Sequence, residues 1–110
     1  MIQQAIRRDP ATALIRALIA LAGPGVELQE HRGTSWASAT FAGMRHVLRL
    51  HFAGADAVAQ GDQLARRLGD QEFTIAGHIV ADIAVRDTHR RCDGEPALTL
   101  TIEALTVEDA

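Results

Sequence analysis

Lysine and tyrosine are absent from this chain of 110 residues, and cysteine and tryptophan occur once each. A single cysteine, Cys92, excludes an internal disulfide. A disulfide-free chain with 47% apolar residues is typical of a reducing compartment, so we expect a cytoplasmic protein. The length corresponds to one domain, 1–110, with a single apolar core.

All 11 basic residues are arginine, against 14 acidic residues, which gives a formal net charge of -3. The codon bias of a GC-rich genome is sufficient to produce arginine without lysine. Nucleic-acid-binding domains usually gather their basic residues on one face, whereas these arginines are spread along the chain. We therefore do not expect nucleic acid as the main partner.

No apolar stretch is long enough to span a bilayer, which takes roughly 20 residues. The segment 11–22 follows Arg7 and Arg8 and ends in small residues, as a secretory signal would. Arg16 interrupts this stretch, however, and Asp9-Pro10 is typical of the N-cap and first turn of a helix. We expect neither a signal peptide nor a membrane partner.

The first helix is predicted between Asp9-Pro10 and Gly23-Pro24, a helix start and a helix stop about 13 residues apart. Only Thr12 and Arg16 are polar in it. Because such a helix needs burial on more than one side, either the sheet wraps around it or a second subunit covers it.

A second helix is predicted to begin with Asp56 as its N-cap and to end at Gly69. Its inward residues are expected to be Ala57, Val58, Gly61, Leu64, Ala65 and Leu68.

Alternation with a period of two predicts strands at 26–31, 35–41, 46–52, 73–86 and 97–107. Turns are expected at 31–34 and 42–45, and a polar loop at 87–96. The core face of 73–86 is expected to carry Phe73, Ile75, Ile79, Ala81, Ile83 and Val85. Leu105 and Val107 fall out of phase with the start of the last strand, which predicts a bulge near Ala104.

These elements follow one another in the order α-β-β-β-α-β-β. Short turns join antiparallel neighbours, and alternation indicates a sheet with one buried face and one partly open face. We therefore predict an α+β fold. It is a two-layer sandwich with two helices on one face of an antiparallel sheet of about four to five strands.

No phosphate loop, dinucleotide fingerprint, HExxH, paired CxxC or nucleophile elbow occurs. His46 and His51 lie on opposite faces of one strand, and His89-x-x-Cys92 is half of a metal site without a second half. Two arginines precede Cys92 and favour its thiolate, but an exposed loop cysteine without a role is the favoured interpretation. We predict no catalytic residue, metal or cofactor.

The expected open face holds the one group of residues that could bind a ligand. This group is Trp36, Arg49, His51, His78 and Asp82. The indole could stack on a ligand, the guanidinium could hold an anion, and a histidine with an aspartate could move a proton. His78 and Asp82 are about 13 Å apart along one strand, so they cannot form a catalytic pair with each other. A solvated surface with ion pairs and a sheet-to-sheet dimer interface are the alternatives.

The apolar first helix and the lack of a catalytic signature favour a self-associating interaction or structural module, a homodimer without catalysis. The alternative is a small-molecule binding protein or enzyme that takes an anionic ligand on the open face. For it we expect Trp36→Ala and Arg49→Ala to change stability by less than about 0.5 kcal/mol while abolishing binding. A second alternative is nucleic-acid binding through the arginine-rich hairpin 86–91.

Overall fold

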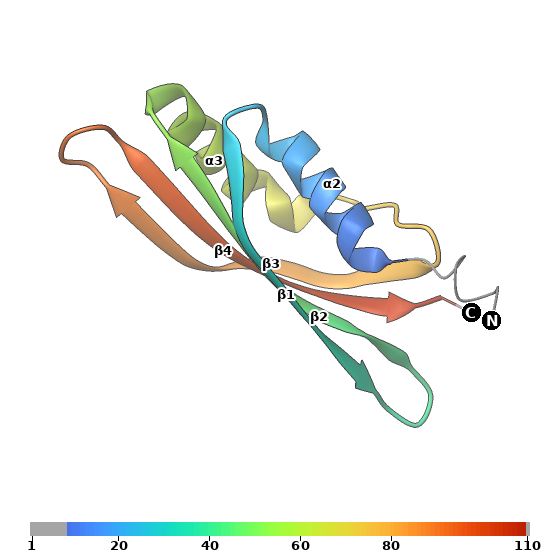
Figure 1. Ribbon diagram of the computed structural model, residues 1–110. Helices are drawn as coiled ribbons and strands as arrows, with labels where there is room; N and C mark the ends of the chain where they lie inside the picture. The colour runs from blue at the N-terminus through green and yellow to red at the C-terminus, as the bar shows by residue number, and fades with distance from the viewer. Residues whose placement is uncertain (1–8, 110) are drawn as a thin grey trace.

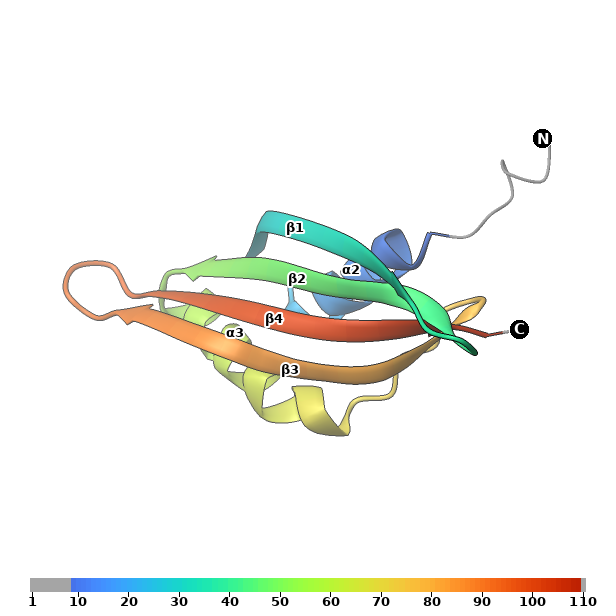
Figure 2. The same ribbon diagram turned by 90° about the horizontal axis from the view of Figure 1, so that it is seen from below.

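The computed structural model describes residues 9–109. Its elements are α2 (Pro10–Ala22), β1 (Val26–Ala37), β2 (Ala42–Ala53), α3 (Ala55–Arg67), the short 3-10 helix η1 (Leu68–Asp70), β3 (His78–Arg91) and β4 (Ala97–Glu108). In this part of the chain, four strands form one antiparallel sheet in the order β1-β2-β4-β3. Both helices lie on one face of the sheet (Figures 1 and 2), which confirms the predicted α+β fold.

The predicted strands 26–31 and 35–41 are one continuous strand, β1, so the turn expected at 31–34 is wrong. Gly33 is extended and opposite His46, and a methyl group at Gly33 would lie 2.6 Å from the Met44 side chain. The actual turn is at 38–41. There Ser38 N donates to Phe41 O at 2.7 Å, and Phe41 N donates to Ser38 Oγ at 3.1 Å. The turn expected at 42–45 is wrong as well, because those residues belong to β2.

Strand β3 runs from His78 to Arg91 rather than over 73–86, so the first half of the polar loop expected at 87–96 is strand. Register shifts interrupt β3 between Val80 and Asp82 and again between Val85 and Asp87. The first shift reverses the alternation. As a result, Val80 packs against the core and Ile79, expected in the core, is 53% exposed.

The last strand matches the predicted segment, but the bulge expected near Ala104 is wrong. Leu98, Leu100, Ile102, Ala104 and Thr106 are all buried, so the alternation is unbroken. Leu105 and Val107 seemed out of phase only because they are apolar residues of the open face.

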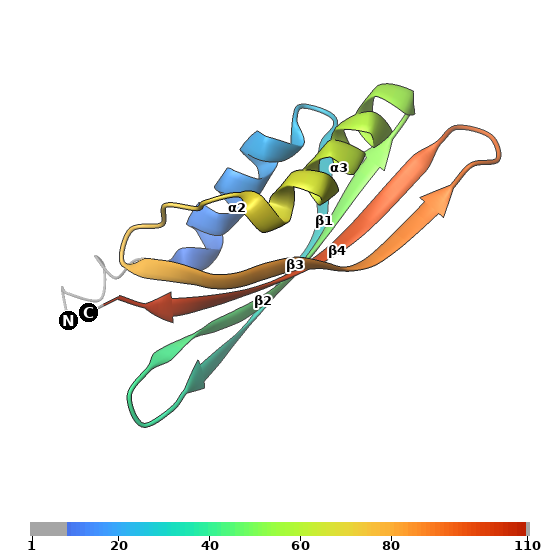
Figure 3. The same ribbon diagram turned by 180° about the vertical axis from the view of Figure 1, so that it is seen from behind.

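The core lies between the sheet and the two helices. Its fully buried large side chains include Leu14 and Leu18 from α2, Leu48, Leu50 and Phe52 from β2, and Leu98, Leu100 and Ile102 from β4. Asp9 caps α2 as predicted, since its side chain accepts from Ala11 N at 3.0 Å. The helix α2 packs against α3 and β1, and Figure 3 shows the two helices side by side. The monomer itself therefore buries most of the apolar surface of α2. The exposed large apolar residue of this helix is Ile19, at 39%.

The N-cap of α3 is Gly54, with φ +93° and no side-chain cap, so the prediction of Asp56 is wrong. Gly54 N donates to Pro96 O at 2.8 Å, and this bond joins the start of α3 to the β3–β4 turn. Leu68 is buried as predicted, although it belongs to η1.

Gly61 is the point of closest approach of α3 to the sheet. A methyl group there would lie 2.8 Å from Leu98 Cδ2 and from Phe52 Cδ1. We expect Gly61→Ala to lower the free energy of unfolding by about 1–3 kcal/mol, because overpacking outweighs the gain of roughly 1 kcal/mol in helix propensity. Urea denaturation measures the change. A more stable variant would show that α3 can move away from the sheet without cost.

The helix layer is shorter than the sheet. A helix of 13 residues is about 20 Å long, whereas a strand of 12 residues is about 40 Å long. The tip of the β1–β2 hairpin therefore extends beyond α2, and the tip of the β3–β4 hairpin extends beyond α3 (Figure 1). Among the described residues, no helix has the length and apolar character needed to cross a membrane.

Candidate functional site

Within residues 9–109, no element covers the face of the sheet away from the helices (Figure 2). The strand registers place its residues in rows across β1, β2, β4 and β3. One row near the β1–β2 turn contains Trp36, Gly43, Val107 and Ile79. The adjacent row contains Thr34, Arg45, Leu105 and Asp82. We call Trp36, Ile79, Leu105 and Val107 the apolar end of the open face.

Trp36 lies over Gly43 on the neighbouring strand. A methyl group at Gly43 would be 3.0 Å from Trp36 Cζ2. The indole is half-buried, and its Nε1 is buried without a hydrogen-bond partner. The ring therefore covers a glycine of the sheet, which is a structural role that its place on a polar strand did not indicate.

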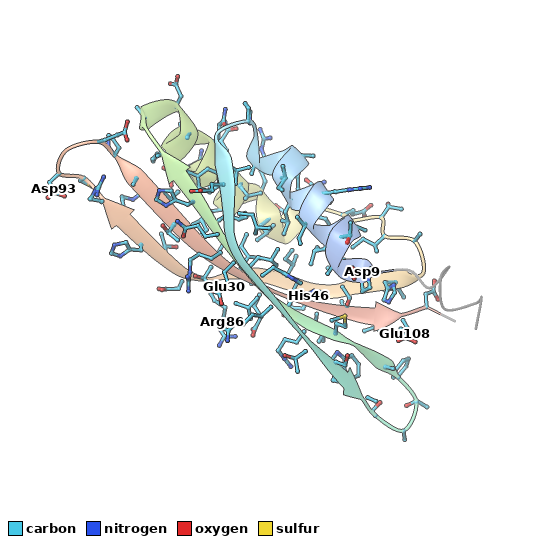
Figure 4. The ribbon with its side chains drawn as sticks, viewed as in Figure 1. Asp9, Glu30, His46, Arg86, Asp93 and Glu108 are labelled. Carbon is cyan, nitrogen blue, oxygen red and sulfur yellow. The ribbon has the colours of Figure 1, made fainter. Side chains whose placement is uncertain are left out.

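The middle of the open face is charged. Glu30 pairs with Arg49 at 3.0 Å and with Arg32 at 3.1 Å. Glu103 pairs with Arg86 and, at 3.8 Å, with Arg45. Figure 4 shows Arg86 on the side of the sheet away from the helices. Exposed pairs of this kind contribute at most about 1 kcal/mol each to stability, so they are better suited to orienting a partner.

Four of the five predicted ligand residues lie on the open face, but they do not converge. Asp82 lies in the same row as Arg45. Arg49 and His51 are four and six residues from Arg45 along β2, which corresponds to about 13 and 20 Å. Trp36 is opposite Gly43, also about 20 Å from Arg49. His51 Nδ1 is hydrogen-bonded to Thr99 Oγ1 at 3.0 Å. These residues enclose no common ligand position.

His78, the fifth residue, is not on the open face as expected. It is opposite Glu108 of β4. Glu108 lies two residues after the buried Thr106, so Glu108 and His78 both belong to the side of the sheet that carries the helices. The bulge after Val80 places His78 and Asp82 on opposite faces. A cavity of about 510 Å³ beside β3, lined by the segment 71–75, has both residues among its walls.

A buried histidine network under the start of α2 was missed by the sequence reasoning. His46 is fully buried, with Nε2 at 3.0 Å from Thr106 Oγ1 and Nδ1 at 3.4 Å from His31 Nε2. Because the Thr106 hydroxyl donates to Met44 O at 3.4 Å, it accepts from His46 Nε2–H, which leaves His46 Nδ1 to accept from His31. Figure 4 shows His46 and Asp9 close to the point where α2 meets the sheet.

The pKa of His46 is lowered from its ordinary value. Burial is the main cause, His31 and His78 lower it further, and Asp9 acts in the opposite direction. Both ring nitrogens of the neutral imidazole are engaged, so His46 is a structural group rather than a free base. Among residues 9–109, no three His, Cys, Asp or Glu side chains are arranged to hold a metal ion.

The arginine-rich hairpin is not a free basic surface. Arg90 forms two hydrogen bonds to Asp62 of α3, at 2.6 and 3.3 Å, and Arg86 is paired with Glu103. The hydrogen bond from Arg90 also lowers the pKa of Asp62. Cys92 at the tip is exposed. These ion pairs neutralise Arg86 and Arg90, whereas among the described residues Arg91 donates only to the backbone oxygen of Glu95, at 3.4 Å.

Comparison with protein-family models, curated proteins and solved structures gives no match to this chain. The functional argument therefore depends on the geometry described above.

Two substitutions on the open face should differ in their effect on stability. We expect Arg49→Ala to change the free energy of unfolding by less than about 0.5 kcal/mol, since it removes one exposed ion pair. Trp36→Ala should cost about 1–3 kcal/mol, because it uncovers Gly43 and loses a half-buried ring. Chemical denaturation of both variants checks the difference. Equal effects would mean that the indole contributes nothing to the fold.

Proposed function

We propose that this protein is a self-associating interaction module without catalysis, and that its partner is a second copy of the chain packed on the open face of the sheet. The observation that carries the proposal is the apolar end. There, Trp36, Leu105 and Val107 are half-buried and Ile79 is 53% exposed on a face that the described residues leave uncovered. Contiguous exposed apolar surface of this kind marks interaction sites.

The size of the face is sufficient. Four strands spaced by about 4.8 Å and about 40 Å long present roughly 760 Å². A stable interface of standard size buries about 800 Å² on each partner. Two copies stacked face to face would thus reach this size without further elements.

The edge strands of the sheet favour a dimer through the open face over a dimer formed by pairing of edge strands. In the described part of the chain, register shifts occur only in β1, between Leu28 and Glu30, and in β3. These are the two edge strands, and bulges in edge strands hinder addition of another strand. The central pair β2–β4 has no register shift over its length.

The charges of the face suit a copy of itself. It carries charges of both signs, because Glu30 and Glu103 each pair with two arginines. A surface that contains both signs can complement itself across a twofold axis. A ligand with charges of one sign, such as nucleic acid, would contact both positive and negative side chains on this face.

Molar mass in solution tests the proposal. Light scattering of the full chain over a concentration series should give about twice 11.8 kDa at micromolar concentration and above. A mass of 11.8 kDa throughout this range would overturn the proposal.

A further inference from the structure

Two of the three exposed large apolar side chains among the described residues lie near one end of the open face. Phe41, in the β1–β2 turn, is 60% exposed, and Ile79 is 53% exposed. The segment 33–44 contains no charged residue. The opposite end of the same face carries His51, Thr99, His89 and Arg91. The open face is therefore strongly asymmetric along the strand direction.

When two identical sheets stack face to face, a twofold axis in the interface has two limiting directions relative to the strands. If the axis is perpendicular to the strands, the apolar end of each copy faces the polar end of the other. If the axis is parallel to the strands, apolar end faces apolar end. The parallel axis also places β2 of one copy over β4 of the other, so that Arg45 and Arg49 approach the partner's Glu103.

We infer that the two copies pack around a twofold axis parallel to the strands, with their apolar ends in contact and both β1–β2 turns at the same end of the dimer. This inference rests on the proposed function and specifies its interface. The uncharged turn continues the apolar end beyond the helix layer, and Phe41 then extends the contact between the copies.

Cross-linking of single cysteines tests this arrangement. The background variant is Cys92→Ser, which removes the native thiol. Val107 and Ala97 are on the open face near opposite ends of β4, about 33 Å apart. With a parallel axis, Val107→Cys in one copy faces Val107→Cys in the other, at a distance that a short bis-maleimide spans. With a perpendicular axis, Val107→Cys faces Ala97→Cys.

We expect Val107→Cys alone to give the cross-linked dimer and a mixture of Val107→Cys with a mass-tagged Ala97→Cys to give no mixed product. Ile19→Cys on α2, outside the open face, controls for collisional cross-linking. Leu105→Cys replaces Val107→Cys should that variant fail to fold.

The other outcomes separate the two proposals. A mixed product without self-cross-linking, in a sample whose mass remains that of a dimer, overturns the parallel arrangement and leaves the proposed function standing. A dimer in which neither pair reacts shows that the apolar end is not in the interface, and this also overturns the inference. A monomeric mass for the unsubstituted chain overturns both the proposed function and the inferred arrangement.

Discussion

Replacement of Ile79 by glutamate should weaken self-association by at least about 100-fold, which corresponds to about 2.7 kcal/mol. Ile79 is in the apolar end and is 53% exposed in the monomer, so the change should have little effect on folding. In the proposed dimer it places a carboxylate against apolar surface without a partner, and an uncompensated buried charge costs about 3–5 kcal/mol. Sedimentation equilibrium at several concentrations gives the dissociation constant of each variant.

The matched control is Ile19→Glu. Ile19 is 39% exposed on α2, which belongs to the opposite layer of the molecule. We expect this variant to dimerise like the unsubstituted chain. If Ile19→Glu dissociates the dimer and Ile79→Glu does not, the interface is on α2, as the apolar character of that helix first suggested.

The sequence predicts the helix α2 well because its signals are local. Asp9-Pro10 and Gly23 are next to the backbone groups whose geometry they determine, and the structure places the helix between them. The strand β4 is also well predicted, since its alternation is unbroken. Burial of α2 was not predictable in the same way, because the surface that covers it comes from α3 and β1.

The wrong assignments of residues to the two faces of the sheet come from bulges. A bulge reverses inside and outside for all residues beyond it, and its position depends on pairing with another strand. The shift after Leu28 turns His31 inward, towards His46, so a strict alternation from Val26 gives the wrong face for His31. The shift after Val80 has the same effect on the placement of His78 and Ile79.

The candidate site was predictable in part for the same reason. Trp36, Arg49 and His51 were placed on the open face correctly, because β2 is regular and its register to β1 is unshifted beyond Glu30. Whether they meet depends on strand order and register, which the sequence does not reveal. The network of His46 and Thr106 joins residues 60 positions apart and had no local signal.

Acid should destabilise the protein through this histidine network. The folded chain holds His46 neutral with its pKa lowered, whereas the imidazole of the unfolded chain titrates near 6.5. The unfolded chain therefore binds one more proton below this pH. The stability that His46 contributes is fully present above about pH 6.5 and is lost as the pH falls towards the folded pKa, by about 1.4 kcal/mol per pH unit for one proton.

The free energy of unfolding, measured in urea at fixed protein concentration between pH 8 and pH 5, should show this slope. The carboxyl groups titrate mainly below this range, and Asp62, whose pKa is lowered, affects stability only in stronger acid. His46→Gln retains an amide that can donate to Thr106 and removes the titration, so its acid slope should be smaller by about one proton. His89→Gln, at an exposed position on β3 outside the network, should retain the slope of the unsubstituted chain. An unchanged slope in His46→Gln would mean that the pKa of His46 is not lowered in the folded chain, and it would overturn the prediction.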